Sequence, residues 1–275
     1  QYNLTFSFSM IVIMAGLTMA GILSGRFYLA EKLYAQAMQE TDSTVIESSL
    51  QKILALRSGY DSYRTSMAKA YLVRAGELSK EANPNVQAVG DYLKRSVNEA
   101  RAATEISPNS VVVWENLATM YESTFVLVSD AGDWAIKSLN SAIDLEPTNP
   151  ILVWRLGNDY LLQDNFVKAA EYFQKSIDLK RDYLGSYIGL ANAYESAKDL
   201  DKAADVYKNL LQMGVTNNTE ILFNFGRILY NRNKKGDKDD AEKLWLEAVR
   251  LQPNYSNALY SLALLYESQN QKQKA

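Results

Sequence analysis

The 275-residue sequence contains no histidine and no cysteine. Without histidine there is no imidazole base, no Ser-His-Asp triad and no histidine metal ligand. Without cysteine there is no thiol nucleophile, disulfide, zinc finger or iron–sulfur cluster. Carboxylate or lysine chemistry remains open, but no convergent set of titratable residues, phosphate loop or dinucleotide fingerprint is evident. We therefore expect no enzyme, no catalytic or metal-binding residues and no cofactor.

Proline and net charge are also low. The chain has 5 Pro, and its 29 basic and 32 acidic side chains leave a formal net charge of -3. This mildly acidic balance argues against a nucleic-acid partner. Apolar residues make up 47% of the chain, which is enough for a sizeable core, and the length allows one or two domains.

Charged side chains are missing from residues 1–25. A membrane-spanning helix needs about 20 mostly apolar residues, and backbone amides in lipid must bond within their own helix. We predict a transmembrane helix in residues 1–25, with 4–25 in the membrane, that continues to about Gln39. A secretory signal peptide, which would need a basic start and a short apolar core, is one alternative. A buried helix of a soluble protein is the other.

Small residues share one face of this segment, namely Gly16, Ala20, Gly21 and Gly25. Such spacing lets two membrane helices approach closely, so we expect a helix–helix contact there. Ordinary glycine usage in lipid is the alternative. The sequence begins at Gln1 and ends at Ala275, where the second helix of a repeat is expected to open. We interpret the sequence as an internal fragment of a larger membrane protein.

Internal repeats begin near Trp114. Five segments share a hydrophobe, then Gly or Ala, then usually Tyr. Their leading residues are spaced by 39, 34, 35 and 37 positions and are Leu117, Leu156, Leu190, Phe225 and Leu262. Four of these segments precede a second block with Ala four residues before a large side chain, at Ala135, Ala169, Ala203 and Ala241. The pattern resembles the tetratricopeptide repeat, a 34-residue helix–turn–helix unit.

This resemblance implies an all-α fold in which the transmembrane helix precedes a right-handed α-solenoid of helical hairpins. A small residue in the first helix lets the paired helices pack closely, and stacking buries the apolar faces. We assign 110–275 to about four full repeats plus the first helix of a fifth. Residues 26–109 are assigned to degenerate helical pairs with a short extra helix or loop near 78–90. NKKGDKDD (233–240) is interpreted as a solvated turn.

In proteins of this family the first helix of each repeat lines a concave surface. The inward positions predict a set of partner-binding residues, which are Trp154, Asn158, Asn192, Glu195, Phe223, Arg227, Tyr230 and Tyr260. Asparagine amides could pair with an extended backbone, and aromatic rings could anchor side chains. Alternatively, the asparagines cap or bridge neighbouring helices and the aromatic side chains pack between repeats.

The leading hypothesis is a membrane-anchored scaffold that binds a protein or peptide through its concave surface. The stretch WAIKSLNSAIDLEPTNPILVWRLG also resembles carboxy-terminal repeats of bacterial O-antigen ligase or polymerase-like membrane proteins. That resemblance implies an accessory domain of a polytopic glycan ligase or polymerase, in a bacterial membrane, with the repeats on the extracytoplasmic side. A freestanding enzyme is the third hypothesis, and no residue set supports it.

Overall fold

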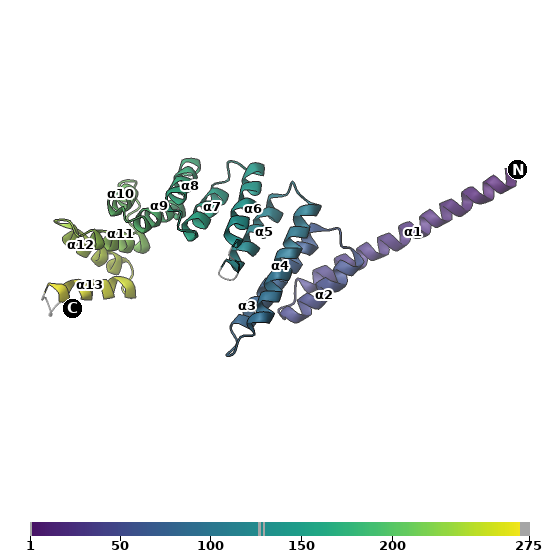
Figure 1. Ribbon diagram of the computed structural model, residues 1–275, viewed down its shortest axis with the longest axis horizontal. Helices are drawn as coiled ribbons and strands as arrows, with labels where there is room; N and C mark the ends of the chain where they lie inside the picture. The colour runs from purple at the N-terminus through teal and green to yellow at the C-terminus, as the bar shows by residue number, and fades with distance from the viewer. Residues whose placement is uncertain (1, 126–127, 129, 270–275) are drawn as a thin grey trace. The chain divides into compact units, whose positions relative to one another are not determined.

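A computed structural model describes residues 2–125, 128 and 130–269, with side chains from residue 10 onward. These residues form thirteen α-helices and no strand, which confirms the predicted all-α fold (Figure 1). The helices are α1 (Tyr2–Ala37), α2 (Ser43–Leu56), α3 (Asp61–Ser79), α4 (Val86–Ile106), α5 (Val111–Thr124), α6 (Ala131–Leu145), α7 (Pro150–Leu162), α8 (Phe166–Leu179), α9 (Leu184–Ser196), α10 (Leu200–Gln212), α11 (Thr219–Arg232), α12 (Asp237–Leu251) and α13 (Ser256–Ser268).

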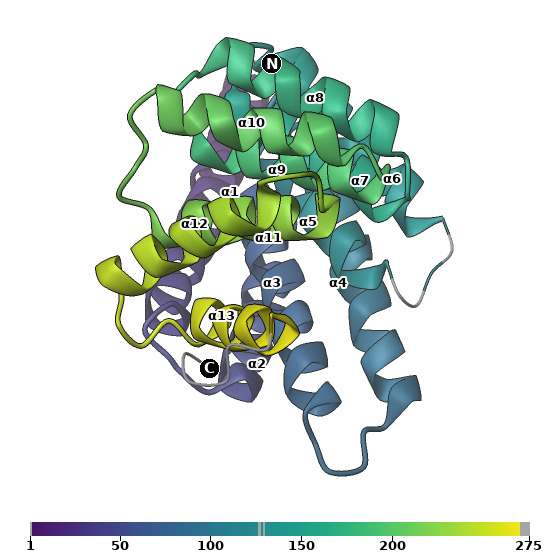
Figure 2. The same cartoon turned by 90° about the vertical axis from the view of Figure 1, so that its left-hand side faces the viewer.

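The chain forms two compact units, Gln1–Leu145 and Glu146–Ala275. In the second unit, consecutive helices pair as hairpins α7/α8, α9/α10 and α11/α12, and α13 follows (Figure 2). We call α7, α9, α11 and α13 the helices A, and α8, α10 and α12 the helices B. The predicted domain bounds stay predictions, and the predicted position of Ala275 lies outside the described residues.

Short polar residues set where these helices begin. The side chains of Asn149, Asn165, Asp199 and Asn218 accept hydrogen bonds from backbone N–H groups in the first turns of α7, α8, α10 and α11. These bonds satisfy donors that have no partner within the helix. The turn between helices A and B uses a left-handed residue in each hairpin, at Asp164, Lys198 and Asn233. The helix caps and the left-handed turn residues therefore both specify where each hairpin begins and turns.

Large side chains of helices B pack against small residues of helices A. The ring of Phe173 on α8 is fully buried and lies against both Gly157 and Gly189. A Cβ atom at those glycines would lie 2.9 Å and 2.4 Å from the ring, respectively. Trp245 on α12 lies in the same way against Gly226, where a Cβ would be 2.6 Å from its Nε1. The close packing predicted at the small residue of the first helix is thus confirmed at Gly157 and Gly226.

In the first unit, α1 has two different halves. Met10–Ala37 is long and apolar enough to cross a membrane by length and composition. Gly16, Gly21 and Gly25 have open space around them, so the predicted helix–helix contact stays a prediction. The second half packs with α2 and α3 (Figure 1), in a cluster that includes Ala30, Ala37, Leu50, Ile53 and Tyr63. The expected continuous helix is confirmed, because α1 runs unbroken to Ala37.

One local expectation is confirmed and one needs correction. The short helix or loop expected near 78–90 is a loop at residues 80–85, and the rest of that stretch belongs to α3, which has 19 residues, and α4, which has 21. The turn at 233–240 is not simply solvated. Asp237 is 5% exposed, accepts two hydrogen bonds from Arg232, at 2.9 and 2.7 Å, and accepts another from the backbone N–H of Lys234. This ion pair closes the hairpin between α11 and α12.

Candidate partner-binding face

The predicted binding residues lie on the helices A, and we call this set the helix-A face. Two of its half-buried aromatic residues, Trp154 and Phe223, occupy equivalent positions on α7 and α11. Each ring meets a tyrosine ring edge-to-face, Trp154 with Tyr183 at 5.8 Å and Phe223 with Tyr255 at 5.6 Å between centroids. Both tyrosines immediately precede the next helix A. These aromatic residues therefore pack between repeats, as the alternative interpretation expected, while remaining partly exposed.

Hydrogen bonds strengthen this packing. The indole Nε1 of Trp154 donates to the backbone oxygen of Gly185 at 3.1 Å, and that of Trp245 donates to the backbone oxygen of Phe223 at 3.1 Å. The indole N–H of half-buried Trp154 and that of buried Trp245 are thus both satisfied, at positions where leaving them unpaired would be costly. Trp154 and Phe223 are consequently parts of the scaffold as well as of its surface.

The two asparagines of the face differ. Asn158 donates from Nδ2 to the backbone oxygen of Trp154 at 3.3 Å, a bond within α7. Asn192, 34 residues later on α9, is half-buried, and its amide has no hydrogen bond with any described residue. An asparagine amide offers two donors and an acceptor. Asn192 is therefore the predicted residue whose bonding capacity the fold leaves open.

An ion pair crosses the face beside Asn192. Arg227 on α11 binds Glu195 on α9 in a bidentate manner, through Nη1 to Oε1 and through Nη2 to Oε2, the latter at 2.9 Å. Their side chains are 34% and 24% exposed, so water reaches the pair. Two parallel charge-assisted bonds fix the relative position of α9 and α11. The face is neutral at this point, because the two charges compensate.

The remaining predicted residues lie apart. Tyr230 packs against Trp245 at 5.7 Å between ring centroids, on the side of helix B. Tyr260 on α13 is 67% exposed. The structure thus brings together Asn192, Glu195 and Arg227, but it does not join all eight residues in one pocket.

An amide-rich hollow of about 530 Å³ lies beside Phe223. Its lining comes from the starts of α11 and α13 and from the residues before them. Five of the lining side chains are amides, those of Asn217, Asn218, Asn224, Gln252 and Asn257. Amides match the donors and acceptors of a peptide backbone, and Phe223 with Tyr255 supplies an aromatic wall. Phe223 is one of the residues predicted from the sequence, whereas the amides around it are not.

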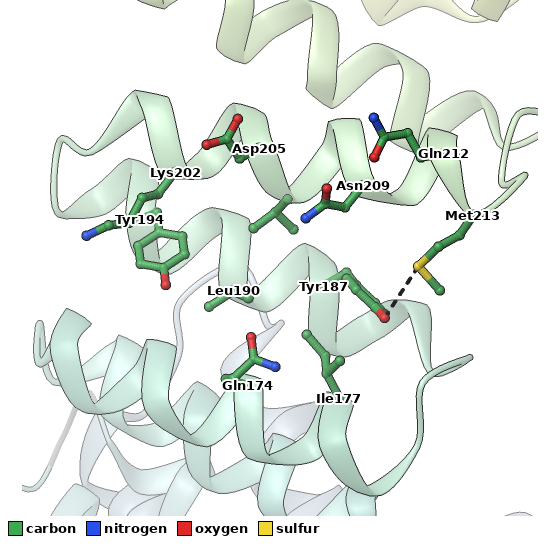
Figure 3. Close-up of a pocket in the computed structure, with 11 residues that line it drawn as sticks. Gln174, Ile177, Tyr187, Leu190, Tyr194, Lys202, Asp205, Asn209, Gln212 and Met213 are labelled. Atoms are coloured by element: carbon green, nitrogen blue, oxygen red, sulfur yellow. Dashed lines mark hydrogen bonds between the residues drawn. The ribbon is translucent and has the colours of Figure 1, made fainter.

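A second cavity, of about 570 Å³, lies on the opposite side of α9, between α8 and α10 (Figure 3). Its floor includes Ile177, Tyr187 and Leu190, and amide side chains such as Gln174 and Asn209 lie at its rim. The hydroxyl of Tyr187 lies 3.6 Å from the sulfur of Met213, and burial raises its pKa. Sequence reasoning missed this cleft because it considered only the inward positions of helices A.

A lysine lies over a helix-A tyrosine in three successive hairpins. In each case the lysine comes eight residues after the tyrosine, with Nζ 4.9–5.8 Å from the ring centroid, in the pairs Tyr160/Lys168, Tyr194/Lys202 and Tyr230/Lys238. Such cation–π contacts are only weakly stabilising at exposed sites. Lys202 also binds Asp199, which lowers the pKa of that carboxyl and raises the pKa of the lysine. The tyrosines near the ends of helices A therefore face the helix-B side.

Family models for the tetratricopeptide repeat match residues 186–219 and 244–275. The chain therefore carries tetratricopeptide repeats, as the sequence pattern predicted. Among solved structures, a tetratricopeptide repeat protein from Parabacteroides merdae is similar, with a TM-score of 0.62 and 13% identity over 89% of this chain and 88% of that one. PilF of Pseudomonas aeruginosa gives a TM-score of 0.56 and 18% identity over 87% and 99%. These likenesses show the fold, an α-solenoid of helical hairpins.

Two curated relatives share part of the sequence. The human protein O-mannosyl-transferase TMTC3 is 26% identical over 235 residues, which are 83% of this chain and 20% of the relative. BBS4, a BBSome complex member of Xenopus tropicalis, is 26% identical over 155 residues, which are 56% of this chain and 28% of the relative. The chain thus spans between about a fifth and three tenths of these relatives. The link to O-antigen ligases stays a prediction.

Proposed function

We propose that this protein is a membrane-anchored, non-catalytic scaffold that binds an extended segment of a protein partner along the helix-A face. The observation that carries the proposal is the open amide of Asn192 next to the Glu195–Arg227 pair. A half-buried amide without an internal partner gains most from a ligand that supplies both a donor and an acceptor. A peptide backbone in an extended conformation has this chemistry.

The charge of the face narrows the class of partner. Arg227, the only cationic residue of the predicted set, is already paired with Glu195. A free carboxylate at the end of a peptide would have no unpaired cation of this set to bind. We therefore expect an internal, neutral segment, with its backbone at Asn192 and an apolar side chain against Phe223 in the amide-rich hollow.

The proposed anchor is the first part of α1. It supplies an apolar helix of sufficient length, and no residue of its most apolar 18-residue window is buried within the unit. An uncovered apolar helix of this kind is costly in water and stable in lipid. The anchor would hold the binding face at a membrane where the partner is present.

The test uses the absence of cysteine. Full-length protein with Asn192→Cys carries a photo-crosslinker on the helix-A face. Asn209→Cys carries the same reagent on α10, where the residue is an exposed amide. Both proteins are placed in nanodiscs and exposed to extracts of the source membrane. We expect one protein to cross-link from position 192 and not from position 209. Cross-linking of that protein from position 209 alone would move binding to the cleft of Figure 3 and contradict the proposal.

A second candidate function is an accessory region of a polytopic glycan-transferring enzyme, with the repeats on the extracytoplasmic side. The match to TMTC3 favours it, because 83% of this chain aligns with one fifth of a larger protein whose name describes a mannosyl-transferase. The parent gene distinguishes the two. Several further hydrophobic segments upstream would favour the second function, and a coding region without them would exclude it.

A further inference from the structure

The turn between α2 and α3 lies beside the end of the apolar run. Residues 10–25 of α1 carry no charge, and Arg26 is the first charged residue of the chain. Nη2 of Arg26 donates to the backbone oxygens of Ala55 and Leu56, at 3.2 and 2.8 Å. These are the last carbonyls of α2, which a cation stabilises. Arg26 therefore fixes the end of α2 at the level where the apolar segment stops.

A second arginine lies at the same level. The guanidinium of Arg57 is between two aromatic rings, 4.6 Å from the centroid of Phe27 and 4.1 Å from that of Tyr60. Phe27 is 43% exposed and its neighbour Tyr28 is 71% exposed. Aromatic side chains gather at the membrane–water boundary, where the ring is buried and its polar edge stays hydrated. The turn 57–60 thus places Arg57 and Tyr60 at the same level as Phe27 and Tyr28 of α1.

The two arginines have no acidic partner. In the part of the chain that the structure describes, neither Arg26 nor Arg57 forms an ion pair with a carboxylate. Further along the same unit, Arg64 binds Glu99 and Arg74 binds Glu77, both at 2.7 Å. A guanidinium carries five donors in a planar fork, and the contacts within the chain leave most of them unused. Arg26 and Arg57, which lie next to the apolar run, therefore keep donors available for an anionic group.

We propose that Arg26, Phe27, Tyr28, Arg57 and Tyr60 form a membrane-surface belt, in which the two arginines bind phosphate groups of anionic phospholipids. This inference rests on the proposed insertion of α1 into a bilayer. In addition to the insertion of α1, the α2–α3 turn contacts the membrane surface. This second contact holds the first hairpins against the lipid headgroups. Phospholipid headgroups fit because guanidinium and phosphate bond in a bidentate manner, and because basic residues are attracted to an anionic membrane surface.

Depth measurements test the position of the turn. Full-length single-cysteine variants, Ser58→Cys in the turn and Ser79→Cys at the other end of α3, are spin-labelled and reconstituted into vesicles. The two sites are matched, since both are exposed serines and lie about 30 Å apart along a helix of 19 residues. A third label, at Met19→Cys, reports whether α1 is in lipid. We expect lipid depth at position 19, headgroup depth at position 58 and water at position 79.

Lipid composition tests the phosphate contact. The label at position 58 is compared in phosphatidylcholine vesicles and in equimolar phosphatidylcholine and phosphatidylglycerol. We expect the label to become less accessible to a water-soluble relaxant with the anionic lipid, and Arg57→Gln to abolish that difference. Arg95→Gln is the matched control, because Arg95 also lies over two rings, Tyr71 and Tyr92, at 5.9 and 5.7 Å. It should leave the lipid dependence unchanged, and far-UV circular dichroism shows that each variant is folded.

The outcomes separate the two proposals. Lipid depth at position 19 with water at position 58 overturns the belt and leaves the membrane anchor intact. Water at position 19 overturns both. Headgroup depth at position 58 with equal accessibility in the two lipids, or loss of the lipid dependence in Arg95→Gln, overturns the role of phosphate at Arg57.

Discussion

Replacing Gly189 with alanine tests the packing that holds neighbouring hairpins together. The new methyl group would lie 2.4 Å from Cε1 of Phe173 and 2.6 Å from its Cζ. The ring cannot retreat toward α7, because an added Cβ at Gly157 would itself be 2.9 Å from Cδ1. Phe173 is fully buried between the two glycines, so the strain must be relieved by moving a helix.

The expected magnitude is a difference between two effects. Alanine is favoured over glycine inside a helix by about 1 kcal/mol. Inserting a methyl group into a filled core costs about 1–3 kcal/mol, and the upper part of this range applies where the neighbouring ring is held on both sides. We therefore expect Gly189→Ala to lower the free energy of unfolding by about 2 kcal/mol.

Gly76→Ala is the matched control, because an added Cβ on this residue of α3 meets no atom within 4 Å. It should raise the free energy of unfolding by about 1 kcal/mol through helix propensity alone. Urea unfolding of the full chain in detergent, followed by far-UV circular dichroism, measures both. If Gly189→Ala stabilises the protein as Gly76→Ala does, the ring contact is wrong. Adding Phe173→Leu to Gly189→Ala should recover part of the loss, because the smaller side chain leaves room for the methyl group.

Three further changes probe other parts of the second unit. Gly157→Leu should lower the free energy of unfolding by a few kcal/mol through overpacking against Phe173, and an unchanged melting temperature would contradict the register. Tyr207→Phe should raise stability by about 1 kcal/mol, because the fully buried hydroxyl has no hydrogen-bond partner among the described residues. Burial raises the pKa of Tyr207, so wild type should lose stability above pH 10 as unfolding allows the phenol to ionise, and the variant should lose less in an alkaline titration. Asp237→Asn should lower stability at pH 7 by about 1–3 kcal/mol. Since Arg232 lowers the pKa of Asp237, the gap between the two proteins should close in thermal melts as the pH falls below the ordinary value of 3.8.

The sequence predicted the hairpin packing well because one small residue repeats at one position. Gly157 and Gly226 lie in that position, and both lie against a large helix-B side chain. Gly189 lies one residue before the repeating hydrophobe Leu190, so the motif gives it no role. Its function depends on Phe173 of the preceding hairpin, 16 residues earlier, and appears only when neighbouring hairpins are stacked.

The sequence predicted which residues of the candidate partner-binding face lie on helices A, but not which of their side chains meet. Helical spacing places Glu195 and Arg227 on helices A, but it cannot show that their side chains meet, since this depends on the separation of α9 and α11. The lysine–tyrosine contacts did leave a signal, a lysine eight residues after each of Tyr160, Tyr194 and Tyr230. That interval spans the turn between the paired helices. Searching for pairs across the turn would have found the helix-B side as well.

The double role of the aromatic residues decides how the helix-A face should be tested. Trp154 contacts Tyr183 and donates to the backbone of Gly185, so removing its side chain weakens the joint between two hairpins. A loss of binding in Trp154→Ala would therefore follow from either a lost anchor or a loosened face. Asn192 has no such contacts to lose, because its amide bonds to no described residue. If Asn192→Ala loses binding and keeps an unchanged unfolding curve, the loss must come from the contact with the partner. The proposed binding face is therefore best tested with this variant.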